Sequence, residues 1–261
     1  MFDLPQRAID KAAQVESFFQ QRVLPNNKLW EQQAKSGQPV PDIQQTLRAE
    51  AKELGLWNMA LPRLADDEPG LRLTNLEFTA VAEILGRLEW GSHVFNCNAP
   101  DVPNMELLQL FGNHAQKQQW LTPLLEGEIG SAFAMTEPYA ASSDPTNLET
   151  RIERDGDEFV INGRKWFASN GSHANCELLI LVGVDSDVAR ESVDASPAVS
   201  HRSSSYLMLR PPRRRRRSAS LTWPRRAPAR RSPKCTFPRS PPLAPPLAPP
   251  RPPLRGAPVR C

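Results

Sequence analysis

Two stretches of the sequence combine the residue types that a pocket for a flat, phosphorylated ligand requires. The first, at 133–144, reads Phe-Ala-Met-Thr-Glu-Pro-Tyr-Ala-Ala-Ser-Ser-Asp. It is a short apolar strand that runs into hydroxyl groups, a turn-forming Glu-Pro and small residues past which a ligand can approach the backbone. The second, at 162–171, reads Asn-Gly-Arg-Lys-Trp-Phe-Ala-Ser-Asn-Gly and sets two rings beside hydrogen-bonding groups. We expect the two stretches to form two walls of one pocket.

The first stretch resembles the first signature of the flavin-dependent acyl-CoA dehydrogenases, and the second resembles the flavin-contacting strand of that family. The resemblance extends over about 54–184 and is closest to the subgroup of family members 10 and 11. It implies FAD as cofactor and the α,β-desaturation of an acyl-CoA substrate in fatty acid β-oxidation. That reaction needs a base for the α proton, and hydrogen-bond donors where the flavin accumulates negative charge.

The resemblance assigns cofactor contacts to the first stretch. The Thr136 hydroxyl and the backbone of Met135 and Thr136 would donate to the isoalloxazine edge, and Phe133 would lie along the cofactor. Ser142 or Ser143 would meet the pyrophosphate and the CoA side of the substrate. The segment 136–144 is one residue longer than the common family form, so the choice between the two serines stays open.

The second stretch departs from the family pattern at its ring. Phe167 takes the position of the tryptophan that usually stacks on the flavin, and Ser169 takes the position of the usual threonine. Trp166 is the alternative if the register shifts by one residue. A phenyl ring offers less area than an indole and no N–H, so the resemblance implies a weaker clamp.

Glu137 and Asp144 lie within the first stretch, and we expect them to be structural, through turn and cap hydrogen bonds. No catalytic residue is assigned, because the family's catalytic carboxylate lies in a C-terminal helical bundle and no such sequence follows Val184. The resemblance therefore predicts a truncated, catalytically incompetent oxidoreductase. It would also lack most of the family's homo-oligomer interface and hold FAD weakly.

An all-helical N-terminal domain is predicted at 1–128 from apolar residues at helical spacing. The first helix would have Asp3 as its N-cap and run to Val23, with Pro25 ending it. Two shorter helices are expected at 103–111 and 113–120, the latter with a capping box at its start.

Two longer helices between these are marked by their ends. One would begin with Pro41 in its first turn and close at Gly55, a position where a left-handed backbone is favourable for glycine. The other would begin with a capping box of Thr74 and Glu77 and close at Gly91. A buried linker is expected between them at 56–62.

The helical spacing of apolar residues ends near residue 130, which predicts the start of a β domain at 129–184. Segments 148–153 and 157–162 would pair as a hairpin around an Asp-Gly turn, and further strands are expected at 165–169 and 176–184. The fold class is therefore α+β, with a helical N-terminal domain and an incomplete, barrel- or sandwich-like β middle domain.

The segment 185–261 differs in composition from the rest of the chain. It holds 17 Lys and Arg against 4 Asp and Glu, whereas 1–184 holds 15 against 25, and 16 of the 27 prolines follow Asp185. We expect a disordered, basic, proline-rich tail, which a splice junction or frameshift in mid-domain would explain. The arginines at 213–217 favour an alternative function, the non-specific binding of nucleic acid or another polyanion.

The four cysteines, Cys97, Cys176, Cys235 and Cys261, show neither Cys-x-x-Cys spacing nor a nearby histidine pair, so the sequence predicts no metal site and no disulfide framework. The sequence shows no signal peptide, no segment long enough for membrane insertion and no transit peptide. The resemblance nevertheless implies a mitochondrial location, with a cytosolic or nuclear one as the alternative.

Overall fold

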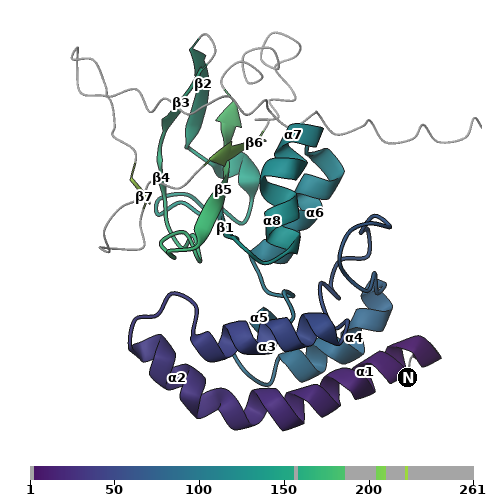
Figure 1. The fold of residues 1–261 in the computed structure, drawn as a ribbon. Coiled ribbons are helices and arrows are strands. Elements are labelled where there is room, and N and C mark those ends of the chain that lie inside the picture. Colours follow the sequence, from purple (N-terminus) through teal and green to yellow (C-terminus); the bar gives the residue numbers. More distant parts are fainter. Residues whose placement is uncertain (1–2, 156–157, 186–203, 210–220, 223–261) are drawn as a thin grey trace, which may run out of the picture.

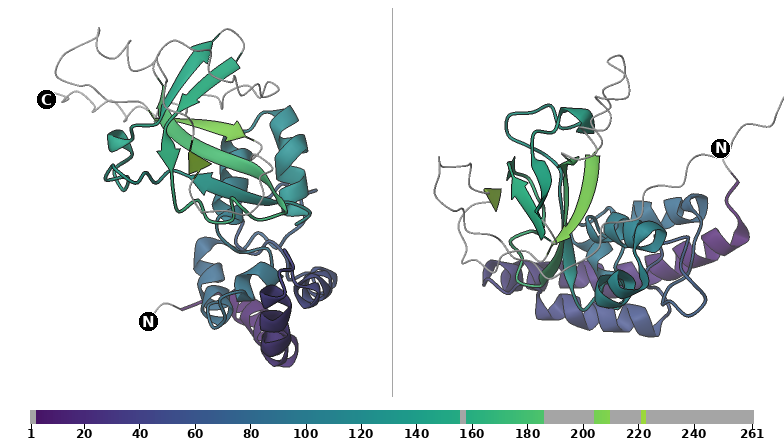
Figure 2. Two further views of the ribbon diagram at one scale, coloured as in Figure 1. Left: turned by 90° about the vertical axis from the view of Figure 1, so that its left-hand side faces the viewer. Right: turned by 90° about the horizontal axis from the view of Figure 1, so that it is seen from above.

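The structure is a computed structural model that describes residues 3–155, 158–185, 204–209 and 221–222. Its first helices form a layer of their own, and a second group of helices lies beside the sheet (Figure 1). The left view of Figure 2 shows the strands gathered at one end of the molecule and the first helices at the other.

The first layer is built from helices that lie between residues 6 and 94. Its elements are α1 (Gln6–Phe18), η1 (Phe19–Val23), η2 (Leu24–Asn26), α2 (Asn27–Lys35), α3 (Asp42–Glu53), α4 (Asn75–Leu85) and α5 (Gly91–Val94). Its apolar stripes meet in one core that includes Phe19, Leu47, Val81 and Phe95, all fully buried. Burial of such stripes supplies most of the stability of helices this short.

Two expected ends of the first helix are wrong. Pro5 holds the N-cap position with φ −56°, so Asp3 lies outside the cap. Pro25 does not end the helical path, because it sits in the first turn of η2, where a missing N–H costs no hydrogen bond. The path then continues into α2, a helix that the sequence reading missed.

The ends of α3 and α4 agree better with expectation. Gly55 has φ +67°, as a left-handed cap requires. The capping box is confirmed, since the Glu77 amide donates to Thr74 Oγ1 at 3.3 Å and the Thr74 amide donates to Glu77 Oε2 at 2.8 Å. The predicted stop is wrong, because Gly86 follows the last turn of α4 and Gly91 begins α5.

The second helical group covers one face of the sheet. It comprises α6 (Asp101–Phe111), α7 (His114–Gln116), η3 (Lys117–Leu121) and α8 (Thr122–Leu125), and the predicted Asn113–Gln116 capping box is confirmed. Met105, Leu108 and Leu124 of this group share a buried cluster with Leu178 and Ile180 of the sheet. The region expected as one helical domain thus contributes to two cores.

The sheet mixes parallel and antiparallel pairs. Its strands are β1 (Gly130–Ala134), β2 (Arg151–Asp155), β3 (Glu158–Asn162), β5 (Cys176–Asp185) and β6 (Ser204–Leu209), and a separate pair joins β4 (Arg164–Lys165) to β7 (Leu221–Thr222). The order is β1-β5-β2-β3; β1 and β2 run parallel to β5, and β6 runs antiparallel to it. β5 is apolar on both faces, since helices cover one face and a second cluster with Ile152 and Ile161 covers the other.

The predicted hairpin is confirmed as β2 and β3, with Asp155 paired to Glu158; the turn residues 156–157 lie outside the described residues. The strand expected at 165–169 is wrong beyond Lys165. Phe167 has φ +51°, which is incompatible with an extended strand, so β4 ends at Lys165.

The segment 185–261 was expected to be a disordered tail. At β6 and β7 it instead forms strands. The run Ser-Ser-Tyr-Leu-Met-Leu at 204–209 can pair with β5 because its backbone completes the edge of a long apolar strand. Residues 186–203, 210–220 and 223–261, including the arginines at 213–217, lie outside the described residues. None of the helices in the described ranges is long and apolar enough to cross a bilayer.

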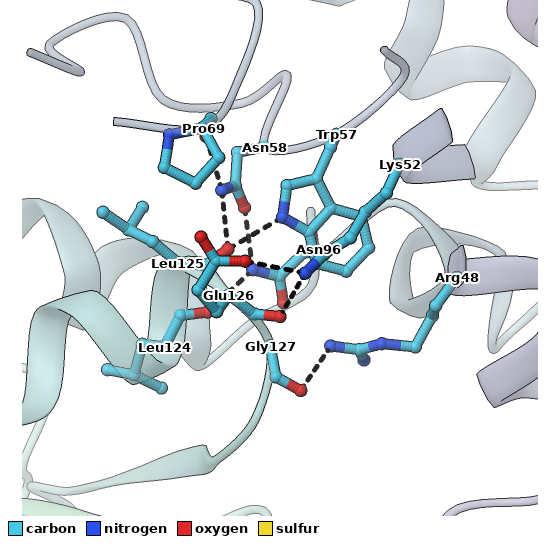
Figure 3. Close-up of polar contacts among 10 residues, drawn as sticks. All are labelled: Arg48, Lys52, Trp57, Asn58, Pro69, Asn96, Leu124, Leu125, Glu126 and Gly127. Atoms are coloured by element: carbon cyan, nitrogen blue, oxygen red, sulfur yellow. Dashed lines mark hydrogen bonds and ion pairs between the residues drawn. The ribbon is translucent and has the colours of Figure 1, made fainter. Parts of the chain in front are cut away.

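A set of polar side chains joins the first layer to the end of α8 (Figure 3). The carbonyls of residues 124–127 are consecutive hydrogen-bond acceptors at a helix C-terminus. Five side chains of the first layer donate to these four carbonyls, and the bonds fix the position of one helical group against the other. The donors, in the order of the carbonyls from Leu124 to Gly127, are Asn96 at 2.9 Å, Trp57 at 2.7 Å with Asn58 at 2.9 Å, Lys52 at 2.7 Å and Arg48 at 3.0 Å.

Candidate functional site

The two chemistry-bearing stretches lie side by side. The Trp166 amide donates to the Thr136 carbonyl at 3.1 Å, two residues beyond the end of β1 and one residue beyond the end of β4. Lys165, the last residue of β4, also reaches the first stretch, since its Nζ donates to the Met135 carbonyl at 2.7 Å. The structure therefore brings the hydroxyl-bearing stretch and the ring-bearing stretch together, as expected.

The first stretch is half-buried at the point where it continues from β1. Phe133 lies on β1 and packs against the cluster shared by α6, α8 and β5, so part of its ring serves the core. Met135 and Thr136 follow the strand and are both half-buried. β1 itself is buried because its parallel partner β5 and the helices enclose it.

The second stretch presents its rings to solvent. Phe167 is 70 % exposed and Trp166 is 37 % exposed, with their ring centroids 4.5 Å apart and their planes tilted by 40°. The positive φ of Phe167 turns the chain away from the sheet, and a hydrogen bond from the Ser169 amide to the Phe167 carbonyl at 2.9 Å closes this turn. Ser169 is exposed beside the rings.

The two candidate serines have different environments. Ser142 is 6 % exposed, and its hydroxyl accepts from the Glu137 amide at 2.8 Å and donates to the Ala140 carbonyl at 3.1 Å. Ser143 is exposed. The Ser142 hydroxyl is therefore engaged within the loop, whereas Ser143 lies at the surface.

A buried ion pair lies beneath the two stretches. Lys165 Nζ is 2.6 Å from Glu137 Oε1, and the two side chains are 0 % and 5 % exposed. The amides of Thr150 and Glu149 donate to Glu137 Oε1 and Oε2 at 2.9 and 2.7 Å. These bonds give Glu137 a structural role, as expected, but its carboxylate binds a buried lysine and the segment before β2 where turn and cap hydrogen bonds were expected.

The environment shifts both members of this pair. Burial alone would raise the pKa of the Glu137 carboxyl, but the hydrogen bonds from Lys165 and from the backbone outweigh it and hold the pKa below its ordinary value. Burial lowers the pKa of the Lys165 ammonium, and Glu137 opposes this shift. Sequence reading missed this pair, because a lysine between an arginine and a tryptophan carries no local sign that it faces inward.

Asp144 caps the short helix η4 (Pro145–Asn147). Its Oδ1 accepts from the Thr146 amide at 2.9 Å and from the Thr146 hydroxyl at 2.7 Å, and these bonds lower the pKa of the carboxyl. The expected structural role is confirmed here too.

A second polar cluster, also missed, fixes the start of β1. Asp101 Oδ1 accepts from the Ser131 amide at 2.7 Å and from its hydroxyl at 2.6 Å, and Asn104 donates to the same hydroxyl at 2.8 Å. The neighbouring His93 is desolvated, which lowers the pKa of its imidazole. Side chains from α6 thus hold the start of the strand that leads into the first stretch.

The arrangement suits a flat, partly anionic ligand. Exposed rings offer a stacking surface, Thr136 and Ser143 offer hydroxyls, and small residues at 140–141 leave the loop open to close approach. Within the described ranges, no group of three or more His, Cys, Asp or Glu side chains is arranged to hold a metal ion.

Two family models match the chain. The N-terminal domain of acyl-CoA dehydrogenase matches residues 6–128, and the middle domain of acyl-CoA dehydrogenase matches residues 132–202.

Individual relatives give the same answer. Acyl-CoA dehydrogenase family member 11 of Gallus gallus is 43% identical over 175 residues, which are 65% of this chain and 22% of that protein. The probable acyl-CoA dehydrogenase FadE2 of Mycobacterium tuberculosis is 42% identical over 187 residues, 70% of this chain and 44% of that protein. The chain therefore spans less than half the length of these curated relatives.

A solved structure agrees in fold as well as in sequence. The structure of a putative acyl-CoA dehydrogenase from Mycobacterium abscessus superposes with a TM-score of 0.67 at 37% identity, and covers 80% of this chain and 51% of that one. The helical layer, the mixed sheet and the matched domains lead to one conclusion: the chain belongs to the acyl-CoA dehydrogenase family, of which it carries the N-terminal and middle domains.

Proposed function

We propose that this chain binds FAD between the stretches 133–144 and 162–171 and carries the cofactor side of an enzyme that desaturates acyl-CoA thioesters in fatty acid β-oxidation. One observation carries the proposal: the hydrogen bond from the Trp166 amide to the Thr136 carbonyl puts an exposed ring surface next to a hydroxyl-bearing strand end. The family supports FAD as the ligand, and the neighbouring rings and hydroxyl group support this location for it.

The residues divide between the parts of the cofactor. Phe167 would stack on the isoalloxazine, with Trp166 as the second ring, and the backbone and hydroxyl of Thr136 would donate to its polar edge. Ser143 would contact phosphate, because the hydroxyl of Ser142 is engaged within the loop. When bound, FAD would supply the acceptor for the hydride that leaves the β carbon of the substrate.

Phe133, Met135 and Ser169 complete the proposed set of cofactor contacts. Phe133 and Met135 lie half-buried on either side of Ala134, and Ser169 is exposed next to the rings. Their contribution would be shape and hydrogen bonding at the margin of the flavin.

The 261-residue chain by itself is proposed to be inactive on acyl-CoA. Glu137 is the carboxylate next to Thr136, and the hydrogen bonds that it accepts from Lys165 and two backbone amides keep it from acting as the base for the α proton. Incubation with acyl-CoA and an artificial electron acceptor should give no flavin-dependent turnover above the blank. The same proposal places the chain in mitochondria, which fractionation of cells carrying a tagged copy tests.

FAD binding itself is tested by titration. FAD fluorescence should be quenched on addition of the purified chain, and FAD should raise the midpoint of thermal unfolding, since a ligand that binds the folded state stabilises it. Thr136→Ala combined with Phe167→Ala should abolish both effects. Phe111→Ala removes a ring of similar size from the surface of α6 and should leave both unchanged. A wild-type chain that neither quenches FAD nor gains stability from it would refute the proposal.

The composition of 185–261 favours a second function, the non-specific binding of polyanions through the arginines at 213–217. Affinity for a random-sequence oligonucleotide should then fall steeply with salt, because each neutralised phosphate releases counterions. It should also survive deletion of residues 1–184. Affinity that is lost with that deletion would reject this function without affecting the first.

A further inference from the structure

We infer that the buried pair of Lys165 and Glu137 is a positioning pair for the cofactor site, which sets the direction in which the backbone of Thr136 presents its hydrogen-bond donor. The inference rests on the proposed FAD binding. Both side chains are buried, and removing two charges from water costs free energy that an apolar pair of the same volume would not. The use of such a pair at this position therefore calls for an explanation in terms of what it orients.

The orientation follows from the peptide bond. The bond between Met135 and Thr136 is trans, since the described residues contain one cis peptide, at Ala99–Pro100. In a trans peptide the carbonyl and the N–H point in opposite directions. Because the Met135 carbonyl accepts from buried Lys165 Nζ at 2.7 Å, the Thr136 N–H points away from the ammonium group. The next carbonyl, that of Thr136, is fixed by the Trp166 amide.

Glu137 extends the same control to the loop. Its carboxylate accepts from the amides of Glu149 and Thr150, which precede β2, and its own amide donates to Ser142 Oγ. The ion pair therefore joins the end of β1, the approach to β2 and the strand before the rings, and the backbone amide of Glu137 adds the turn that carries Ser143. Charged groups make stronger and more directional hydrogen bonds than neutral ones, which suits this task.

The experiment compares Lys165→Met with a matched control. Lys52 also binds one carbonyl and one carboxylate, Glu126 O at 2.7 Å and Glu126 Oε2 at 2.9 Å, but it lies on α3 in the first helical layer. The purified 261-residue chain and both variants are titrated with FAD, and the dissociation constant and the visible absorption spectrum of bound flavin are recorded. We expect Lys165→Met to raise the dissociation constant about tenfold or more, the loss that outer-shell partners cause at metal sites. The flavin band should also shift, because the hydrogen bonds to the isoalloxazine edge would change. Lys52→Met should change neither.

A second variant guards against misfolding. Lys165→Met leaves a buried carboxylate without its cation, whereas Glu137→Gln with Lys165→Met removes both charges and has the better chance of keeping the fold. If the pair positions the two stretches, the double variant should lose FAD affinity and shift the flavin band as Lys165→Met does.

Amide hydrogen exchange without FAD separates this inference from the proposed function. Lys165→Met should speed exchange in 133–143 and in 164–170 and leave α4 unchanged, because local opening reports lost local contacts. Unchanged exchange in both segments, or an unchanged dissociation constant and spectrum in a chain that binds FAD, would overturn the inference. If neither the wild type nor any variant bound FAD, while Lys165→Met still changed amide hydrogen exchange, both the proposed function and the cofactor role of the pair would be rejected.

Discussion

Gly163 leaves no room for a side chain against Thr150: a Cβ atom on Gly163 would lie 2.6 Å from Thr150 Cβ and 2.7 Å from Thr150 Cγ2. Gly163 lies between β3 and β4, and Thr150 directly precedes β2. The Thr150 amide donates to Glu137 Oε1 at 2.9 Å. The glycine is thus required by space, one residue before the strand that carries Lys165.

Gly163→Ala should therefore destabilise the chain by about 1–3 kcal/mol, the usual cost of overpacking a filled site. Urea denaturation followed by tryptophan fluorescence measures the change. Gly86→Ala is the control, because a Cβ there would approach nothing closer than 3.3 Å. Equal stability of the two variants would contradict the crowding described here.

Gly127 combines a positive φ with a crowded surrounding. Its φ is +69°, and an added Cβ would clash with the Arg48 guanidinium and lie 2.9 Å from the Trp57 ring. Gly55 has nearly the same φ, +67°, with nothing within 4 Å. We expect Gly55→Ala to cost about 1 kcal/mol for the left-handed backbone alone. Gly127→Ala should cost about 1–3 kcal/mol more, because the clash is added. Thermal melts of both variants decide whether that ranking holds.

Stability should fall in acid, partly through Glu137. The pKa of its carboxyl is lower in the folded chain than its ordinary value of 4.5, because hydrogen bonds outweigh the effect of burial. A carboxyl shifted in this direction stabilises the fold fully above its unfolded pKa, and the contribution is lost as the pH falls through the folded value. Melting temperatures between about pH 7 and pH 3 should therefore fall less steeply for Glu137→Gln than for the wild type.

Other carboxyls with lowered pKa, those of Glu16, Glu50, Glu77 and Asp144, keep part of the acid dependence in that variant. Glu31→Gln changes an exposed residue of α2 and serves as the control. If Glu137→Gln and Glu31→Gln gave parallel curves, Glu137 would not contribute to the acid limb.

Cys97 and Cys176 should be unreactive in the folded chain. Desolvation raises the pKa of each thiol to about 12, so almost no thiolate is present near neutral pH. Iodoacetamide at about pH 8 should label the peptides of both cysteines only after denaturation, as mass spectrometry of the digest would show. Rapid labelling of either peptide under native conditions would show that the thiol is more accessible than the structure has it.

The sequence predicted elements whose cause is local. The capping boxes at Thr74 and Asn113, the glycine stop at Gly55 and the hairpin of β2 and β3 depend on residues a few positions apart, so pattern reading found them. The continuation past Pro25 was missed because a proline is neutral in a first turn and disruptive elsewhere, and the sequence does not say which applies.

The sequence predicted the two stretches of the candidate site but not the buried contacts that hold them in place. The stretches at 133–144 and 162–171 stood out by residue type, and the structure brings them together. Two supporting contacts join segments far apart in the chain: Lys165 is buried against Glu137, and Asp101 accepts hydrogen bonds from Ser131. The hydrogen bond to Ser142 is local, but it depends on how the loop folds. Such pairings leave no mark on the spacing of neighbouring residues.

The donors that meet the end of α8 have a mechanical consequence. Four adjacent carbonyls are held by side chains from three segments of the first layer: Arg48 and Lys52 on α3, Trp57 with Asn58, and Asn96. A load that pulls the first layer away from the end of α8 is therefore shared among these bonds. Bonds loaded side by side yield together, whereas bonds loaded in series yield one at a time. We therefore expect the seam at the end of α8 to resist stretching as a single unit and to give way in one step.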